Sequence, residues 1–162
     1  MPKVYIEKIE HLEPEFLKEK GIQGIIVDLD NTIAPRKKEE VPESIKKWIR
    51  EIRARGLRII LISNSSRKRT EKLAHDLDLE FIPNALKPFP MAFLKASRKL
   101  KIPLNALAVV GDQIFTDILG GNICGTFTIL VSPLSKKTDF FTTKIIRILE
   151  MFILKKLKNK KG

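Results

Sequence analysis

Short apolar runs that end in polar residues constrain the fold of this chain more than any other feature. Residues 24–27, 57–62 and 106–110 read GIIV, LRIILI and ALAVV. Each run is short and continuous, which is typical of a strand that is buried on both faces. Segments with the apolar spacing of helices separate these runs. This alternation of strand and helix predicts a parallel sheet with helices on both faces.

The clearest helical segment covers residues 42–55. Pro42 suits its first turn, and Gly56 suits the position just after its end. Apolar residues recur along one face of this segment, namely Ile45, Trp48, Ile49 and Ile52. Other segments are expected to form helices at 67–79 and 89–102 and a last strand at 126–133. We therefore predict an α/β, Rossmann-like three-layer fold with a central parallel sheet.

The composition limits the class of protein. A chain of 162 residues with 43% hydrophobic residues is expected to form one globular domain. Its one cysteine, Cys124, excludes an intrachain disulfide and fits a reducing compartment. We see no secretory signal, and no apolar run reaches the roughly 18 residues of a membrane-spanning helix. The sequence thus predicts a cytoplasmic protein.

Positive charge is concentrated in the last 27 residues. Nine Lys or Arg and two acids lie in 136–162, so this tail carries +7 of the net charge of +12. We predict a folded domain at 1–135 and a basic amphipathic helix at 136–162. The apolar face of that helix would hold Phe141, Ile145, Ile148, Leu149 and Phe152.

Two interpretations of the tail are open. A basic amphipathic helix binds anionic membrane surfaces, which would make the protein peripheral on the inner face of the membrane. Alternatively, the apolar face packs on the body and the lysines are solvated. The charge also permits nucleic-acid binding, but the tail aromatics lie on or beside the apolar face rather than in a pattern suited to base stacking. The sequence makes no prediction of oligomeric state.

Polar residues follow the predicted strands at their carboxyl ends, which in a parallel sheet meet at one crevice. They are Asp28, Asp30, Ser63, Asn64, Lys87, Asp112 and Asp117. Carboxylates suit Mg²⁺, and a lysine with a serine hydroxyl suits a phosphoryl group. One aspartate can attack phosphorus, and a second can act as general acid and base.

Four motifs carry a family resemblance. In order, DLDNT, LISNS, KP and GDQIFTD resemble the motifs of the haloacid dehalogenase (HAD) phosphatases, subfamily IIIA. The resemblance implies that Asp28 is the nucleophile and Asp30 the general acid/base. It also implies that Ser63 binds the phosphoryl group and that Lys87 stabilises the anionic intermediate. A Mg²⁺ ion would be held by Asp28, Asp112 and the backbone carbonyl of Asp30, with Asp117 as a supporting carboxylate.

Some of these residues have a simpler interpretation. Asn31, Thr32 and Asn64 either bind substrate or only form turns. Asp117 either supports the metal site or caps the helix that follows Asp112.

The gaps between motifs bear on the substrate. Only 32 residues separate Asp30 from Ser63 and 23 separate Ser63 from Lys87, which leaves no room for a large cap domain. An open site suits a phosphate on a large carrier. The stretch GDQIFTDILGGNICGTFTILVSP also resembles the YqeG-type branch, which includes phosphatidylglycerophosphate phosphatases. That resemblance implies a phospholipid substrate. The alternatives are a phosphoprotein, nucleic-acid end or sugar phosphate as substrate, or an RNA- or ribosome-binding protein with a vestigial site.

Overall fold

The computed structural model describes residues 1–135. The predicted amphipathic helix at 136–162 lies outside the described residues, and the division of the chain into body and tail stays a prediction. Within residues 1–135, no helix is both long and apolar enough to cross a bilayer.

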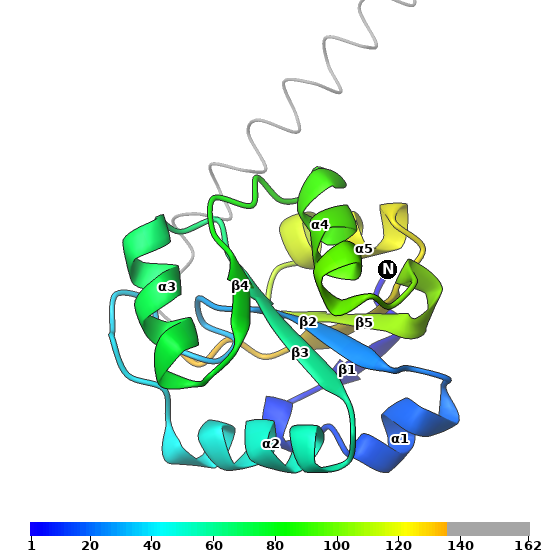
Figure 1. Cartoon of the computed structure of the whole chain (residues 1–162), viewed down its shortest axis with the longest axis horizontal. Coiled ribbons are helices and arrows are strands. Elements are labelled where there is room, and N and C mark those ends of the chain that lie inside the picture. The colour runs from blue at the N-terminus through cyan, green and yellow to red at the C-terminus, as the bar shows by residue number, and fades with distance from the viewer. Residues whose placement is uncertain (136–162) are drawn as a thin grey trace, which may run out of the picture.

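Six parallel strands form one sheet in the order β1-β6-β5-β2-β3-β4 (Figure 1). Their bounds are β1 Val4–Ile6, β2 Gly24–Asp28, β3 Arg58–Ile62, β4 Glu80–Ile82, β5 Leu107–Gly111 and β6 Phe127–Val131. The predicted central parallel sheet is confirmed. The edge strand β1 was not expected from the sequence, because its three residues show no clear alternation.

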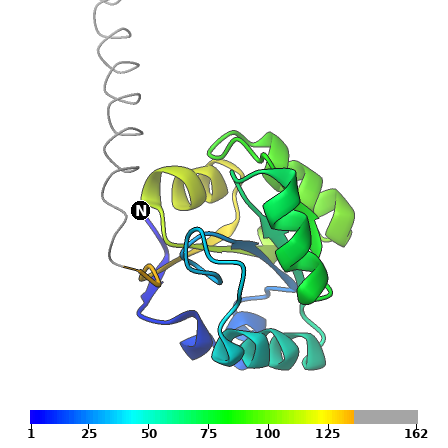
Figure 2. The same cartoon turned by 90° about the vertical axis from the view of Figure 1, so that its left-hand side faces the viewer.

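Helices cover both faces of this sheet. They are α1 Pro14–Glu19, α2 Glu43–Ala54, α3 Arg67–Asp76, α4 Met91–Leu100 and α5 Leu119–Ile123, with short turns η1 Ile9–His11, η2 Leu104–Ala106 and the π-helical η3 Ile114–Ile118. One core joins α1, α2 and α3 to one face of the sheet, and a second core joins α4 to the other. Figure 2 shows α2 and α5 on opposite sides of the strands.

Alternating strand residues supply the two cores. Ile25 and Val27 of β2 pack toward α2, whereas Ile26 packs toward α4. The predicted apolar face of α2 is buried as a whole. On this face, the Trp48 indole donates a hydrogen bond to the Leu12 carbonyl at 2.9 Å, so its one polar group is satisfied.

The order of the strands fixes the position of the crevice. β2 and β5 are neighbours, with Val27 paired to Val110. The chain leaves β2 toward α2 on one face and leaves β5 toward α5 on the other. This is the switch point of an open parallel sheet, where ligands bind beyond the carboxyl ends. The two central strands therefore end side by side in Asp28 and in Gly111, which precedes Asp112.

No cap domain interrupts the described part of the chain. The connection from β2 to β3 contains one helix, α2, and the connection from β3 to Lys87 contains α3 and β4. This confirms the prediction of a three-layer fold without a large cap. The carboxyl edge of the sheet is consequently bordered by loops.

Candidate active site

Three carboxylates meet at the carboxyl ends of β2 and β5. Asp28, Asp112 and Asp117 each place an oxygen within 4.8 Å of the others. Asp28 and Asp117 are buried, and Asp112 is half-buried. Asp28 ends β2, Asp112 follows β5, and Asp117 returns from η3. The structure thus brings together residues that are up to 89 positions apart in the sequence, which are Asp28 and Asp117.

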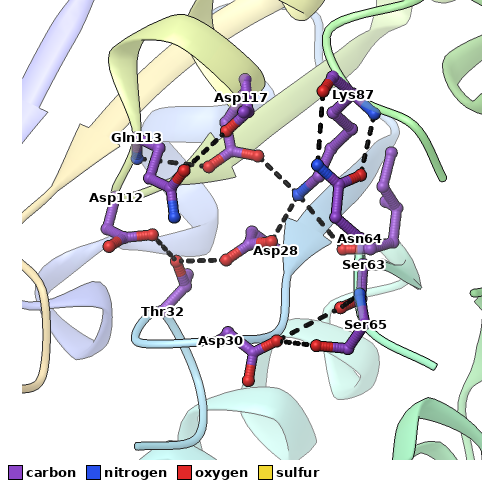
Figure 3. A network of polar contacts seen from close by, with 12 residues as sticks. Asp28, Asp30, Thr32, Ser63, Asn64, Ser65, Lys87, Asp112, Gln113 and Asp117 are labelled. Atoms are coloured by element: carbon purple, nitrogen blue, oxygen red, sulfur yellow. Dashed lines mark hydrogen bonds and ion pairs between the residues drawn. The ribbon is translucent and has the colours of Figure 1, made fainter. Parts of the chain in front are cut away.

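Lys87 lies inside this carboxylate cluster. Its ammonium group forms ion pairs with Asp28 and, at 2.6 Å, with Asp117 Oδ1, although its side chain is only 3% exposed. The Asn64 side chain fixes the Lys87 backbone: its Oδ1 accepts from the Lys87 N–H at 2.8 Å, and its Nδ2 donates to the Lys87 carbonyl at 3.3 Å. Asn64 therefore positions the lysine (Figure 3).

Burial and charge shift the pKa values of the cluster. Burial raises the pKa of Asp28 well above its usual range, with Lys87 opposing and Asp117 and Asp112 adding to the shift. Burial followed by the charge of Asp117 raises the pKa of Asp112 to about 7. For Lys87, burial lowers the pKa, but Asp117 and Asp28 outweigh it and hold the pKa above its ordinary value. The lysine is therefore charged at neutral pH.

Thr32 bridges the two strands of the site. Its hydroxyl oxygen lies 3.2 Å from Asp28 Oδ2 and 3.3 Å from Asp112 Oδ1. One hydroxyl has a single proton to donate, so it can donate to only one of the two carboxylates. The other contact then needs a proton on the carboxyl group. The raised pKa of Asp112 is consistent with such a proton.

These residues fit a hard divalent cation. When they are ionised, the three carboxylates of Asp28, Asp112 and Asp117 carry three negative charges, and Lys87 carries one positive charge. The group then has a net charge of −2, which one divalent cation would balance. Their donors are all carboxylate oxygens, the ligand type that Mg²⁺ and related ions prefer. The neighbouring carboxylates add to the pKa shifts that burial causes at Asp28 and Asp112, and a bound cation would oppose that contribution.

The Asp30 carboxylate lies in a separate group of contacts. Its Oδ1 accepts from Arg69 Nη2 at 2.9 Å and Nε at 3.1 Å. Its Oδ2 accepts from the Ser65 hydroxyl and, at 3.4 Å, from the Ser63 hydroxyl. In Figure 3, Asp30 lies with Ser63 and Ser65, apart from the group of Asp112 and Asp117. The predicted acid/base is thus held against the loop after β3.

Two further predicted residues shape loops of the site. Ser63 is fully buried, and its hydroxyl also accepts from the Ser65 N–H at 3.0 Å. Asn31 has a φ of 63°, a left-handed conformation that asparagine tolerates better than most residues. Its Oδ1 accepts from the Arg36 N–H at 3.2 Å and from the Ser135 hydroxyl at 3.0 Å. These contacts place Asn31 in the turn after β2.

Two residues that contact Asp30, Ser65 and Arg69, were not predicted from the sequence. Ser65 is the last residue of the second motif, LISNS, and Arg69 lies in the first turn of α3. A basic run that opens a helix directly after a predicted site strand was the available signal for Arg69. The reason for a glycine before Asp112 was not predicted either: a Cβ at Gly111 would overlap the Asp117 carboxylate.

The site opens into a small pocket of about 140 Å³. It is lined by Asp28, Asp30, Arg36, Asn64, Ser65, Lys87, Gln113 and Thr116. Larger hollows of about 360, 560 and 600 Å³ lie elsewhere on the described residues. None of these larger hollows is lined by the carboxylate cluster or Lys87. The candidate site is therefore identified by the residues that line its pocket and not by the volume of the pocket.

Comparison with known families confirms the resemblance seen in the motifs. The model of a family described as mitochondrial PGP phosphatase matches residues 1–134. The probable phosphatase YqeG of Bacillus subtilis is 36% identical over 160 residues, which cover 99% of this chain and 92% of that protein. Phosphatidylglycerophosphate phosphatase 1 of Arabidopsis thaliana is 26% identical over 96% of this chain and 47% of its own length. The chain thus spans about half of that plant relative.

Solved structures agree on the fold. The cobalt-bound deoxy-D-mannose-octulosonate 8-phosphate phosphatase of Haemophilus influenzae matches with a TM-score of 0.57 and 16% identity, over 70% of each chain. A 2-haloacid dehalogenase of Pseudomonas syringae matches with a TM-score of 0.55 and 18% identity, over 73% of this chain and 90% of that one. The predicted HAD fold is confirmed.

Proposed function

Because the chain belongs to the mitochondrial PGP phosphatase family and is a phosphatase of the HAD type, we propose that it hydrolyses phosphatidylglycerophosphate to phosphatidylglycerol at a membrane surface. The observation that carries the chemistry is the buried group of Asp28, Lys87, Asp112 and Asp117 beneath a small polar pocket. The lipid substrate is supported by the plant and algal relatives, whose names specify it.

Asp28 is the nucleophile in this proposal. Its carboxylate lines the pocket and attacks the phosphorus atom, forming an aspartyl-phosphate and breaking the bond to the ester oxygen. Lys87 faces Asp28 Oδ1, so its positive charge can stabilise the negative charge of the transferred phosphoryl group. Three polar side chains hold the surrounding loops in place. The Thr32 hydroxyl contacts Asp28, the Ser63 hydroxyl donates to Asp30, and Asn64 Oδ1 accepts from the Lys87 N–H.

Asp30 is the proposed general acid and base. It lines the same pocket and would protonate the leaving ester oxygen, so that the alcohol departs neutral. It would then take a proton from the water that attacks the aspartyl-phosphate, which returns Asp28 to its free carboxylate. Arg69 and Ser65 hold the Asp30 carboxylate in one orientation for both steps.

Asp28, Asp112 and Asp117 are the residues that would hold Mg²⁺, and the backbone carbonyl of Asp30 stays a predicted fourth ligand. When bound, the ion reduces the repulsion between these carboxylates and an anionic phosphate. The cobalt-bound phosphatase of the same fold supports a divalent cation in this proposal.

The absence of a cap domain from the described residues supports a large substrate. The pocket is lined by the end of β2, by Thr116 of η3 and by loop residues, with no cap domain over it in residues 1–135, so a phosphate can approach while its carrier stays outside. A pocket of about 140 Å³ accommodates little more than the phosphate itself. The lipid remainder would therefore stay in the bilayer during the reaction.

The deciding experiment measures phosphate release from phosphatidylglycerophosphate in anionic vesicles with Mg²⁺, for wild type and Asp28→Asn. Release by the wild type alone supports the nucleophile and the lipid substrate together. If only a soluble aryl phosphate is hydrolysed, the HAD chemistry stands and the lipid substrate is wrong. No hydrolysis of either ester contradicts the proposal.

A further inference from the structure

A set of exposed apolar side chains borders the active-site lysine. Leu86, Phe89 and Met91 are 70%, 67% and 59% exposed, and we call these three residues the apolar rim. They lie in the loop from β4 to the start of α4, whereas Lys87 between them is buried. Side chains of this size are normally removed from water, so three of them exposed within six positions need an explanation.

The backbone of this loop is fixed. The Ala85 N–H donates to the Ser63 carbonyl at 2.8 Å, and the Asn84 N–H donates to the Ser65 carbonyl at 3.1 Å. Leu86 has a φ of 52°, a left-handed conformation that is unusual for a leucine. Strained residues of this kind persist where the surrounding structure holds them, often at functional sites. The exposure of the rim is therefore built into the fold.

The rim adjoins a residue that lines the pocket. Leu86 directly precedes Lys87, which lines the pocket together with Asp28. On the other side of the pocket, Ile114 is 47% exposed and directly follows Gln113, a second lining residue. Exposed apolar side chains thus directly adjoin pocket-lining residues in two separate segments, the loop before α4 and the start of η3. Figure 1 shows the loop between β4 and α4 on the outside of the molecule.

The charge around the rim is positive. Residues 81–111 contain five Lys or Arg and no Asp or Glu, but Lys87 is buried between two aspartates and Lys99 pairs with Glu80, which leaves three of the five cations for the surface. Lys95 and Arg98 are exposed on α4, and Arg36 lines the pocket itself. Apolar side chains bordered by cations match an anionic lipid surface, in which the side chains enter the acyl boundary and the cations meet the headgroups. Nucleic acids are bound through phosphate contacts and base stacking, and of the three rim side chains only Phe89 could stack on a base, whereas Leu86 and Met91 suit an apolar medium.

We propose that the apolar rim inserts into an anionic phospholipid bilayer and thereby places the pocket at the level of the lipid phosphates. This rests on the proposed lipid substrate and adds a docking surface within the described body, separate from the tail. Leu86 and Phe89 flank Lys87 in the sequence, so their insertion would bring the bilayer close to the lysine. A phosphate on a headgroup then reaches Asp28 without leaving the membrane.

A tryptophan in the rim tests insertion directly. In the full-length protein, Phe89→Trp is mixed with vesicles of phosphatidylcholine and phosphatidylglycerol that carry brominated acyl chains, which quench nearby indoles. The matched control is Ile123→Trp, because Ile123 is 58% exposed at the end of α5 and is not among the residues that line the pocket. The native Trp48 is 3% exposed and gives the same background in both proteins. Quenching at position 89 and none at 123 is expected. No quenching at 89, or equal quenching at both positions, overturns the proposal. The rim would then be interpreted as a contact surface for a protein partner.

A second variant connects insertion to turnover. Phe89→Ser with Met91→Ser leaves the strained Leu86 unchanged. We expect about tenfold weaker binding to the anionic vesicles and about tenfold slower release from vesicle-bound phosphatidylglycerophosphate. Hydrolysis of a soluble aryl phosphate should stay within about twofold of wild type. Unchanged vesicle binding, or an equal loss on the soluble ester, contradicts the proposal. If the wild type releases no phosphate from the lipid, the proposed function fails, while the quenching result still decides insertion.

Discussion

The Lys87 ammonium group lies between the carboxylates of Asp28 and Asp117 and pairs with both, in a position almost closed to water. Neither carboxylate could remain ionised at such depth without a cation beside it. The arrangement also explains why a glycine precedes Asp112, since only a residue without a Cβ allows Asp117 to approach β5. In the proposed function, stability and chemistry thus depend on the same four residues, the three aspartates and this lysine.

Replacing the lysine should destabilise the protein and inactivate it. Lys87→Met removes one partner of a buried ion-pair group, for which the cost is typically about 3–5 kcal/mol in the free energy of unfolding. The measurement is urea unfolding monitored by Trp48 fluorescence. Lys99→Met is the control, because its pair with Glu80 is exposed at 51% and 52%. That variant should change the stability by at most about 1 kcal/mol. Equal costs for the two variants would contradict the role of Lys87.

The stability of the metal-free protein should fall as the pH rises from about 4 to about 7. The pKa of Asp112 is about 7 in the folded protein and near the ordinary 3.9 in the unfolded chain. The folded state therefore binds more protons in this range, and raising the pH removes that stabilisation. Melting temperatures measured across this range in a chelator are expected to show the decline.

Asp112→Asn supplies the matched test of that pH dependence. The variant carries no titrating group at this position, so its melting temperature should vary less with pH and exceed that of the wild type above pH 7. Mg²⁺ should raise the melting temperature of the wild type increasingly as the pH rises, because metal binding needs ionised carboxylates. The variant should respond little to Mg²⁺. A wild-type protein that ignores Mg²⁺ at every pH would show that the cluster is not a metal site.

Arg69 is expected to act through the orientation of Asp30. Arg69→Ala should lower kcat by about tenfold to a hundredfold for an alkyl phosphate, whose leaving oxygen needs a proton from the general acid. The loss should be smaller for a nitrophenyl phosphate, whose leaving group departs without protonation. The comparison of the two esters separates positioning from general damage. An equal loss on both esters would indicate only a structural role.

Gly111→Ala tests the close approach of Asp117 to the sheet. The added Cβ meets the buried carboxylate, so Asp117 must move away from Lys87. We expect a loss of about 1–3 kcal/mol in the free energy of unfolding, together with reduced activity. Gly21→Ala is the control, because a Cβ there meets no atom within 4 Å, and only its left-handed φ of 72° opposes the change. A Gly111 variant as stable as wild type would mean that Asp117 has another position available.

The central strands and the candidate site residues could be predicted from the amino-acid sequence. Buried strands leave continuous apolar runs, and the polar residues that follow them stand out against that pattern. Asp28, Ser63, Lys87 and Asp112 could therefore be identified as site residues from local sequence and motif order. The helix at 43–54 was also predictable, because its buried face repeats at helical spacing.

Which of these residues contact one another became clear only from the three-dimensional structure. The sequences of β2 and β5 do not show that the two strands are neighbours, because their pairing depends on where the crossover from β4 to β5 places β5. The separation of Asp30 from the other aspartates depends on the turn after β2 and on Arg69, which lies 39 positions away. The exposure of Leu86, Phe89 and Met91 is likewise set by contacts to the neighbouring loop. The direction of a side chain depends on backbone dihedral angles that long-range packing determines. A local sequence pattern does not specify these angles.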